Sequence, residues 1–235
     1  MMCLMMMRKM RMISNKPNFK KVYEIANEML IRTNCINDFP YSVKALAKEQ
    51  ADVQVVSYKK AKEKYDIPID KFGSVSAHLE KCNGAHIIFF NNEDCKQRIR
   101  FSLGHELGHV VSGHKMDLDE HDPIYAKQEI EANYFAAQIL MPDQIIRECE
   151  NRGYRITDEY LVSSFGVSHE AARKRRDSLS SFKWRDKSEK QFDDIILYLY
   201  KDFIDKIAPN KNVFMYDIET DILMQNERDT WNSYR

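Results

Sequence analysis

The stretch FSLGHELGHVVSGH, residues 101–114, carries two histidines four positions apart, with a glutamate directly after the first. Apolar residues separate the polar ones at helical spacing, which predicts a helix from about Gln97 to Ser112. Residues four apart lie on one helical face, so His105 and His109 can direct their imidazole nitrogens at one point. Without partners, two histidines and a glutamate would be costly to bury in so apolar a helix. The stretch therefore predicts a metal-binding helix.

Glu106, beside the first histidine, suggests that this metal site is catalytic. Neutral imidazole is a good zinc ligand, and a glutamate one position round the helix can reach a water at the metal without being a ligand. Zinc lowers the pKa of such a water to about 7, so the glutamate can take its proton. Gly108 leaves room for the close approach of a neighbouring element or of substrate. The H-E-x-x-H pattern alone also fits a helix with ordinary half-buried polar residues.

A second predicted helix, residues 126–140, offers the third ligand that a catalytic zinc site needs. It carries Glu129 and Glu131, and no cysteine lies near. Because these two glutamates are two positions apart, they point to different faces of the helix. Their spacing leaves both open as the ligand, and it predicts a site of two histidines and one glutamate with an open fourth position.

The first stretch together with EIEANYFAAQILMP, residues 129–142, resembles the ImmA/IrrE family of metallopeptidases. The lead-in IIFFNNEDCKQRIR, residues 87–100, is similar as well, and the resemblance covers roughly residues 20–180. It implies that Glu129 is the third ligand of a gluzincin-like zinc site. It also implies that Asn133, four residues further on the same face, holds a ligand imidazole by a hydrogen bond. Glu131 is then structural or faces solvent.

The same resemblance implies a soluble, site-specific endopeptidase with Glu106 as its catalytic base. Such proteins cut a helix-turn-helix transcriptional repressor, which relieves repression on a phage or mobile element or in a stress response. His114 also fits the family pattern and is a candidate residue of the cleft, the alternative being a helix-end histidine that interacts with the macrodipole. His121 and Tyr125 stay open as donors to the reacting carbonyl, and His78 is expected to be an ordinary strand residue.

An alternative function comes from LVSSFGVSHEAARKRRDSL, residues 161–179, which resembles a helix-turn-helix. Four consecutive basic residues on its second helix, Arg173, Lys174, Arg175 and Arg176, can contact DNA phosphates. This reading makes the chain a DNA-binding regulator with a structural metal. The favoured reading is a helical subdomain that packs on the peptidase and exposes a basic face, because Lys+Arg and Asp+Glu both total 36. A third use of the segment is docking of the repressor.

The predicted fold class is α+β, with a small, mainly antiparallel sheet packed on the metal-binding helix, surrounding helices and a helical C-terminal part. The Asn83-Gly84 pair predicts a hairpin between the last two strands. The expected strands are 53–58, 73–80 and 85–90, and a terminal hairpin is expected at 212–226. The further expected helices are 18–33, 43–50, 157–178 (as a pair) and 189–207. Ser42, Asp143 and Ser168 are expected to cap helices. The expected divisions are a Met-rich disordered tail (1–17), a zinc metallopeptidase domain (18–150), a helix-turn-helix-like subdomain (151–182) and a C-terminal helix with an extension of unknown role (183–235).

Composition agrees with a folded protein of one or two domains: of 235 residues, 43% are hydrophobic and 31% are charged. The five cysteines form no C-x-x-C pair, and no apolar run approaches the roughly 18 residues that span a bilayer. In the Met-rich start, basic residues follow the apolar run, the reverse of a signal peptide. We therefore expect a cytoplasmic protein that has no membrane partner, with Met12 as an alternative start.

Overall fold

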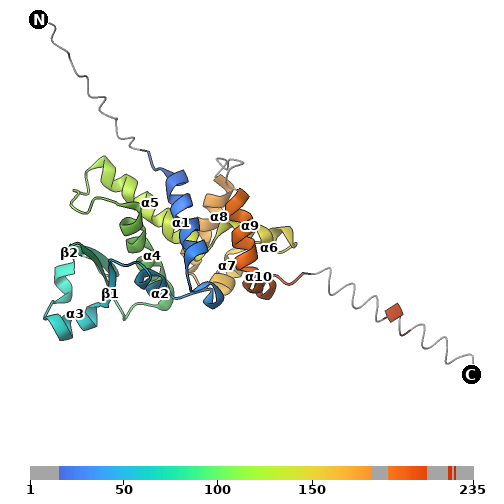
Figure 1. Ribbon diagram of the computed structural model, residues 1–235, viewed down its shortest axis with the longest axis horizontal. Helices are drawn as coiled ribbons and strands as arrows, with labels where there is room; N and C mark the ends of the chain where they lie inside the picture. The colour runs from blue at the N-terminus through green and yellow to red at the C-terminus, as the bar shows by residue number, and fades with distance from the viewer. Residues whose placement is uncertain (1–15, 73, 182–189, 211–221, 224, 226–235) are drawn as a thin grey trace, which may run out of the picture.

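The computed structural model describes residues 16–72, 74–181, 190–210, 222, 223 and 225. A small sheet lies at one side of this part and a larger group of helices at the other (Figure 1). The predicted α+β class is confirmed. The Met-rich start and most of the hairpin expected at 212–226 lie outside the described residues.

The sheet has three strands, β1 (Val53–Ser57), β2 (Ala77–Cys82) and β3 (Ala85–Phe90), in the order β1-β3-β2. The last two form the predicted antiparallel hairpin. Its turn residues, Asn83 and Gly84, have φ angles of 50° and 85°, as a two-residue hairpin turn requires. Since β3 lies in the middle, β2 is an edge strand.

Two expectations about the sheet need correction. β1 pairs with β3 in parallel, so the sheet is mixed, not mainly antiparallel, and β2 begins at Ala77, not at residue 73. A parallel pair needs a crossover, which here passes through α3 (Tyr58–Tyr65), η2 (Ile69–Phe72) and β2. The sequence did not predict α3, because its eight residues are mostly charged and only Tyr58 and Ala61 are buried.

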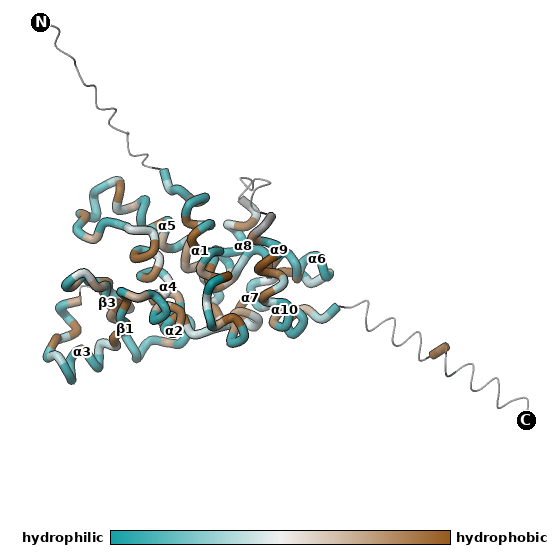
Figure 2. The backbone as a smooth tube through the Cα atoms, viewed as in Figure 1, coloured by the Kyte–Doolittle hydropathy of each residue, from teal (hydrophilic) through white to brown (hydrophobic). Residues whose placement is uncertain are grey.

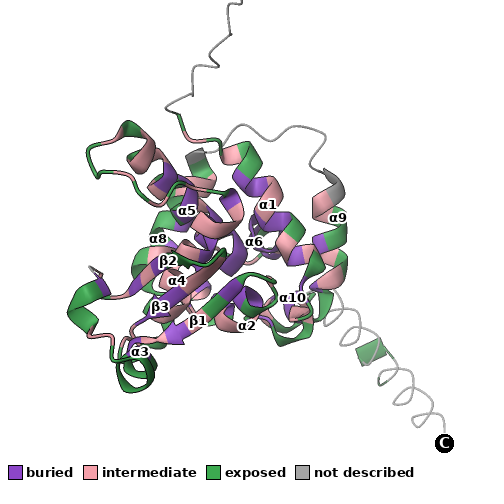
Figure 3. Cartoon of the chain, turned by 60° about the vertical axis from the view of Figure 1, so that its left-hand side comes forward, coloured by how far each residue is buried: buried purple, intermediate pink, exposed green. Residues whose placement is uncertain are grey.

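Each face of the sheet packs against a different layer, as the period of two along a strand dictates. Ile88 and Phe90 belong to the main core that the helices share. Phe89 points to the opposite face, where it packs with Tyr58 and Phe72 in a smaller cluster. Figure 3 shows buried residues concentrated where the sheet meets the central helices. The predicted packing of the sheet on the metal-binding helix is therefore confirmed.

The two central helices are α4 (Lys96–Ser112) and α5 (Pro123–Leu140). The second begins before residue 126, because Asp122 caps it by accepting a hydrogen bond from the backbone N–H of Ile124 at 2.8 Å. Glycines on α4 face α5. A Cβ atom built on Gly108 would lie 3.2 Å from Cα of Ala132, so the neighbouring element for which this glycine leaves room is α5.

The remaining helices surround this pair, with apolar residues interleaved among polar ones along each (Figure 2). They are α1 (Phe19–Arg32), η1 (Ile36–Asp38), α2 (Val43–Lys48), α6 (Asp143–Asn151), α7 (Asp158–Phe165), α8 (His169–Ser181), α9 (Lys190–Leu199) and α10 (Lys201–Ile207). The predicted helix-turn-helix pair is confirmed as α7 and α8. Ser168 caps α8, since its Oγ accepts from the N–H of Ala171 at 3.2 Å.

Three details of the helices differ from the prediction. The helix expected at 189–207 is broken at Tyr200, whose buried hydroxyl donates to the carbonyl of Leu30 at 2.9 Å, a tertiary contact that periodicity does not encode. Asp143 is the first residue of α6 and Pro142 holds the N-cap position. Ser42 occupies the N-cap of α2, but its side chain makes no capping bond.

One residue of the predicted basic face, Arg175, lies in the interior with 2% of its surface exposed. Its Nε donates to the carbonyl of Met141 at 3.0 Å, and its guanidinium also contacts Gln138. The amide of Gln138 in turn donates to Asn27 at 2.9 Å and to Asp143 at 3.0 Å. Buried polar groups need such partners, so this network ties α8 to α5, α6 and α1.

We predict that Gly108→Ala lowers the free energy of unfolding. Alanine gains about 1 kcal/mol over glycine in a helix interior, but overpacking costs about 1–3 kcal/mol. At Gly108 the Cβ would meet the backbone of α5, so the cost exceeds the gain. Urea denaturation measures the change. Gly104→Ala is the control, because its nearest contacts, Cβ of Ala136 at 3.3 Å and the movable Cδ1 of Ile139 at 3.4 Å, are less close than those of Gly108. Equal effects of the two substitutions would contradict the prediction.

Candidate metal centre

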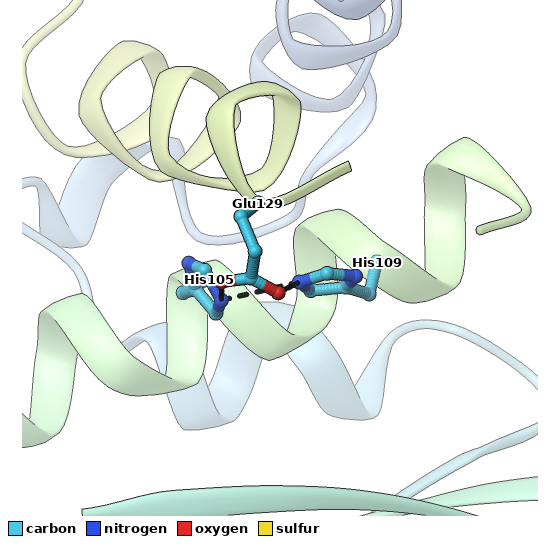
Figure 4. A group of neighbouring side chains, drawn as sticks. All are labelled: His105, His109 and Glu129. Atoms are coloured by element: carbon cyan, nitrogen blue, oxygen red, sulfur yellow. Dashed lines mark hydrogen bonds and ion pairs between the residues drawn. The ribbon is translucent and has the colours of Figure 1, made fainter. Parts of the chain in front are cut away.

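Three side chains converge between α4 and α5 (Figure 4). His105 and His109 project from one face of α4, and Glu129 reaches between them from α5. Nε2 of His105 lies 3.3 Å from one carboxylate oxygen of Glu129, and Nε2 of His109 lies 3.3 Å from the other. The two Nε2 atoms are 3.1 Å apart. The predicted helical spacing therefore brings the histidines together as expected.

This geometry fits a small divalent cation. Tetrahedral ligands about 2.0–2.1 Å from zinc are about 3.3 Å from one another. The two Nε2 atoms, 3.1 Å apart, are near that separation, and each lies 3.3 Å from a different carboxylate oxygen of Glu129. All three side chains are partly buried, and in their ligand form, with a lone pair on each Nε2, the two imidazoles would repel the carboxylate unless a cation lay between them. The residues present thus suit a metal ion.

Electrostatics at the centre favour an ionised carboxylate. Hydrogen bonds from His105 and His109 hold the pKa of Glu129 well below its usual range, although burial opposes this shift. Burial disfavours protonation of His105, but the hydrogen bond to Glu129 and the charge of Glu106 outweigh it and raise its pKa. An anionic Glu129 facing two imidazoles is the ligand set that the family resemblance implies.

Each metal histidine is also held by its second ring nitrogen. Nδ1 of His105 lies 3.1 Å from Oδ1 of Asn133, an oxygen that can only accept, so Nδ1 carries the proton. When a metal takes the place of the hydrogen bond between Nε2 and Glu129, Nε2 offers its lone pair to that metal while Nδ1 stays bonded to Asn133. Nδ1 of His109 lies 3.1 Å from Nδ1 of His114. The structure therefore places Asn133 at the contact that the family resemblance implies.

Glu131 does not join the cluster of metal-binding atoms. It is buried, with 6% of its surface exposed, and its carboxylate lies 3.0 Å from Nε2 of His114. His114 lies on the far side of the His109 ring from Glu129. Burial lowers the pKa of His114 to about 4, and the neighbouring His109 adds to this shift, so His114 is neutral at pH 7.

A cavity of about 510 Å³ opens beside the cluster. Burial raises the pKa of Glu106 on its wall, while His105 and His109 partly counteract this shift. The charge of Glu129, followed by burial, raises the pKa of Tyr125. The other lining residues are Phe72, Ser74, Ser76, Ala77, His78, Leu79, Phe101, Ser102, Lys115, Met116 and Gln128.

Sequence reasoning missed His78 as a residue of this cavity. It lies on β2 beside the buried Ala77 and Leu79, and its ring packs near Phe72 with centroids 6.0 Å apart. Its side chain lines the cavity together with Glu106 of α4, a helix that packs against both β2 and β3. No signal in the sequence alone gives the order of the strands, so no motif could have identified it.

Comparison with known families agrees with this geometry. The family model Peptidase M78, described as the IrrE N-terminal-like domain, matches residues 49–176, which is more than half of the chain. The match includes all of α4 and α5. A comparison with curated proteins gave no match.

We predict that His105→Ala and Glu129→Ala each abolish metal binding, because only two of the three protein ligands remain. Elemental analysis after dialysis measures the metal content. The unaltered chain should retain about one zinc ion per molecule. Ile130→Ala is the control, because that residue is the neighbour of Glu129 on α5 and is 46% exposed. Full zinc retention by Glu129→Ala would rule out the ligand assignment.

Proposed function

Because the chain belongs to the Peptidase M78 family, the IrrE N-terminal-like family, we propose that it is a zinc-dependent endopeptidase that cleaves one protein at a specific site. Membership makes the chain a metallo-endopeptidase; zinc, the residue roles and the substrate are the proposed parts. The observation that carries them is the convergence of His105, His109 and Glu129 beside Glu106 on the wall of one cavity. Sites of two histidines and a carboxylate also accept manganese, and we propose zinc because two imidazoles and one carboxylate with an open fourth position form a common ligand set of catalytic zinc.

Glu106 acts as general base and then as general acid. Bound zinc supplies a Lewis acid that polarises the substrate carbonyl and lowers the pKa of water. Glu106 takes the proton of the attacking water and passes it to the leaving amine. Burial raises the pKa of Glu106, which makes its carboxylate a stronger base for the proton of the attacking water. The protonated side chain can still give that proton to the leaving amine. Tyr125, on the same wall, offers a hydroxyl donor to the carbonyl oxygen.

The substrate binds as an extended strand along β2. This edge strand pairs with β3 alone among the described strands, so its other edge can accept a strand of substrate. Ser76, Ala77 and His78 place that strand along the cavity. A segment that binds in this way cannot be inside a folded element, which suits a linker between folded parts. Apolar residues of the cavity wall, among them Phe101 and Met116, accept an apolar side chain next to the cleaved bond.

The substrate that we propose is a helix-turn-helix repressor, whose cleavage relieves transcription on a mobile element or in a stress response. Support comes from the family resemblance. We place the reaction in the cytoplasm, where repressors act. In the part of the chain that the structure describes, no helix has the length and apolar character needed to cross a membrane.

We predict that Glu106→Gln retains zinc but loses at least about 10²-fold in cleavage rate, because the general base is gone while the three ligands remain. The measurement is cleavage of a repressor encoded beside this gene, with metal content determined in parallel. Glu120→Gln, in the exposed loop before α5, is the control that removes one carboxylate and keeps activity. Full relief of repression by Glu106→Gln would exclude the peptidase mechanism.

The alternative, a DNA-binding regulator with a structural metal, is favoured by one observation: a tight turn at Gly166 joins the helices α7 and α8. The basic residues of α8 are largely committed elsewhere. Arg175 is buried, Nζ of Lys174 lies 2.7 Å from Glu170, and Nη1 of Arg176 lies 3.3 Å from Asp158. Surface pairs are weak and can rearrange, but a buried arginine cannot contact phosphate.

We predict that the purified protein binds DNA only weakly and without sequence preference, since α8 presents a reduced basic face. A gel-shift assay over several salt concentrations measures this binding. Neutralising Arg173 and Arg176 together should leave repressor cleavage unchanged. Sequence-specific binding that this double variant abolishes would instead establish the regulator.

A further inference from the structure

We propose that His114 and Glu131 form a hydrogen-bonded chain that positions His109 as a metal ligand, and that the start of α1 anchors this chain. The inference rests on the proposed function only in taking His105, His109 and Glu129 as the metal site. It assigns roles to two residues that neither bind the metal nor line the cavity.

The direction of each hydrogen bond follows from the groups present. The Glu131 carboxylate is an acceptor, so Nε2 of His114 donates to it across 3.0 Å. The other contact of His114 joins two Nδ1 atoms, and a His109 ring that binds metal through Nε2 carries its proton on Nδ1, so Nδ1 of His114 is the acceptor. Nδ1 of His109, 3.1 Å away, must then donate. Nε2 of His109 is left with its lone pair directed at the metal-binding cluster, as a ligand requires.

The backbone at the end of α4 brings His114 into this position. Gly113 ends the helix with a φ of 68°, in the left-handed region that favours glycine. The N–H of His114 then donates to the carbonyl of His109 at 3.0 Å. This turn reverses the chain and folds the His114 ring back onto His109. With 6% of its side chain exposed, His114 is held there between His109 and Glu131.

Residues at every second position of α5 (129, 131 and 133) contact the two metal histidines or the His114 ring beside them. Glu129 contacts both Nε2 atoms, and Asn133, one turn later, contacts Nδ1 of His105 directly. Glu131 lies between them in sequence and points to another face, from which it reaches no metal ligand itself. His114 spans the remaining distance between Glu131 and His109. Both glutamates of the E-x-E pattern therefore serve one site, the second through an intervening ring.

The start of α1 anchors Glu131 from outside the family match, which begins at residue 49. The backbone N–H of Asn18 donates to Oε1 of Glu131 at 2.6 Å, and Nζ of Lys127 lies 3.8 Å from the same oxygen. Lys21 donates to the carbonyl of Ser112 at 3.2 Å, directly before the turn at Gly113. α1 thus holds both the carboxylate and the helix end that carries His114.

The test is zinc affinity, measured by competition with a chelator on the full chain. Loss of a group that orients a metal ligand typically weakens metal binding about 10- to 100-fold. We expect that range for His114→Ala and for Glu131→Ala. His114→Asn should lose less, because its Oδ1 can replace Nδ1 as the acceptor for His109. Thermal unfolding of the zinc-free variants shows whether each still folds.

His86→Ala is the matched control. His86 also lies beside a carboxylate, with Nδ1 3.3 Å from Asp52, but it is on β3 and outside the metal centre. We expect it to leave zinc affinity unchanged. If His114→Ala binds zinc within about twofold of the unaltered chain, against the loss of 10-fold or more expected for such a group, the proposed chain has no positioning role.

A second readout does not depend on folding of a variant. In the zinc-loaded protein, nitrogen-15 NMR of the imidazole rings should show His114 protonated at Nε2 and His109 protonated at Nδ1. His114 protonated at Nδ1 instead would overturn the proposal while leaving the metal site intact. Failure of the unaltered chain to bind zinc at all would overturn the proposed function and this inference with it.

Discussion

The close contact between α4 and α5 at Gly108 is the constraint on which the site depends. A side chain there would meet Phe135 at 3.0 Å and the backbone of Ala132 at 3.2 Å, so only hydrogen allows the observed approach. Glutamate has a short reach, and Glu129 contacts both histidines at 3.3 Å only because the helices are this close. Any spreading of the pair would separate the carboxylate from the imidazoles before it disturbed either helix.

That closeness has a cost that a metal ion can offset. It brings two imidazole nitrogens and a carboxylate within 4.8 Å of one another in a partly buried place, where solvation is reduced. The chain adds polar support around them, with Asn133 on His105 and His114 on His109. Supporting contacts of this kind orient a ligand and fix its tautomer. The arrangement is thus explained by metal binding and not by stability of the metal-free fold.

The sequence predicted α4, α5 and the pairing of the two candidate metal-binding histidines because these follow from local helical periodicity. His105 and His109 share a face whatever else the fold does, and the resemblance selected Glu129 over Glu131. What depends on distant segments was not predictable. The start of α1, which lies 113 residues earlier in the chain, holds Glu131. The parallel pairing of β1 depends on a crossover through a mostly charged helix. Arg175 looked like a surface base because its buried partners lie on other helices.

Contacts on two sides of the central pair leave one side for substrate. α1 contacts Glu131 and the end of α4, and Arg100 of α4 donates to the carbonyls of Phe165 and Gly166 at 2.7 Å, which joins that helix to the turn between α7 and α8. The start of α1 and the turn between α7 and α8 therefore cover α4 and α5 at the points where they contact them. The cavity opens along β2, whose outer edge pairs with no other strand among the described residues, and His78 and Glu106 both line it. The same packing that holds the metal-binding residues together thus directs an extended substrate to that edge.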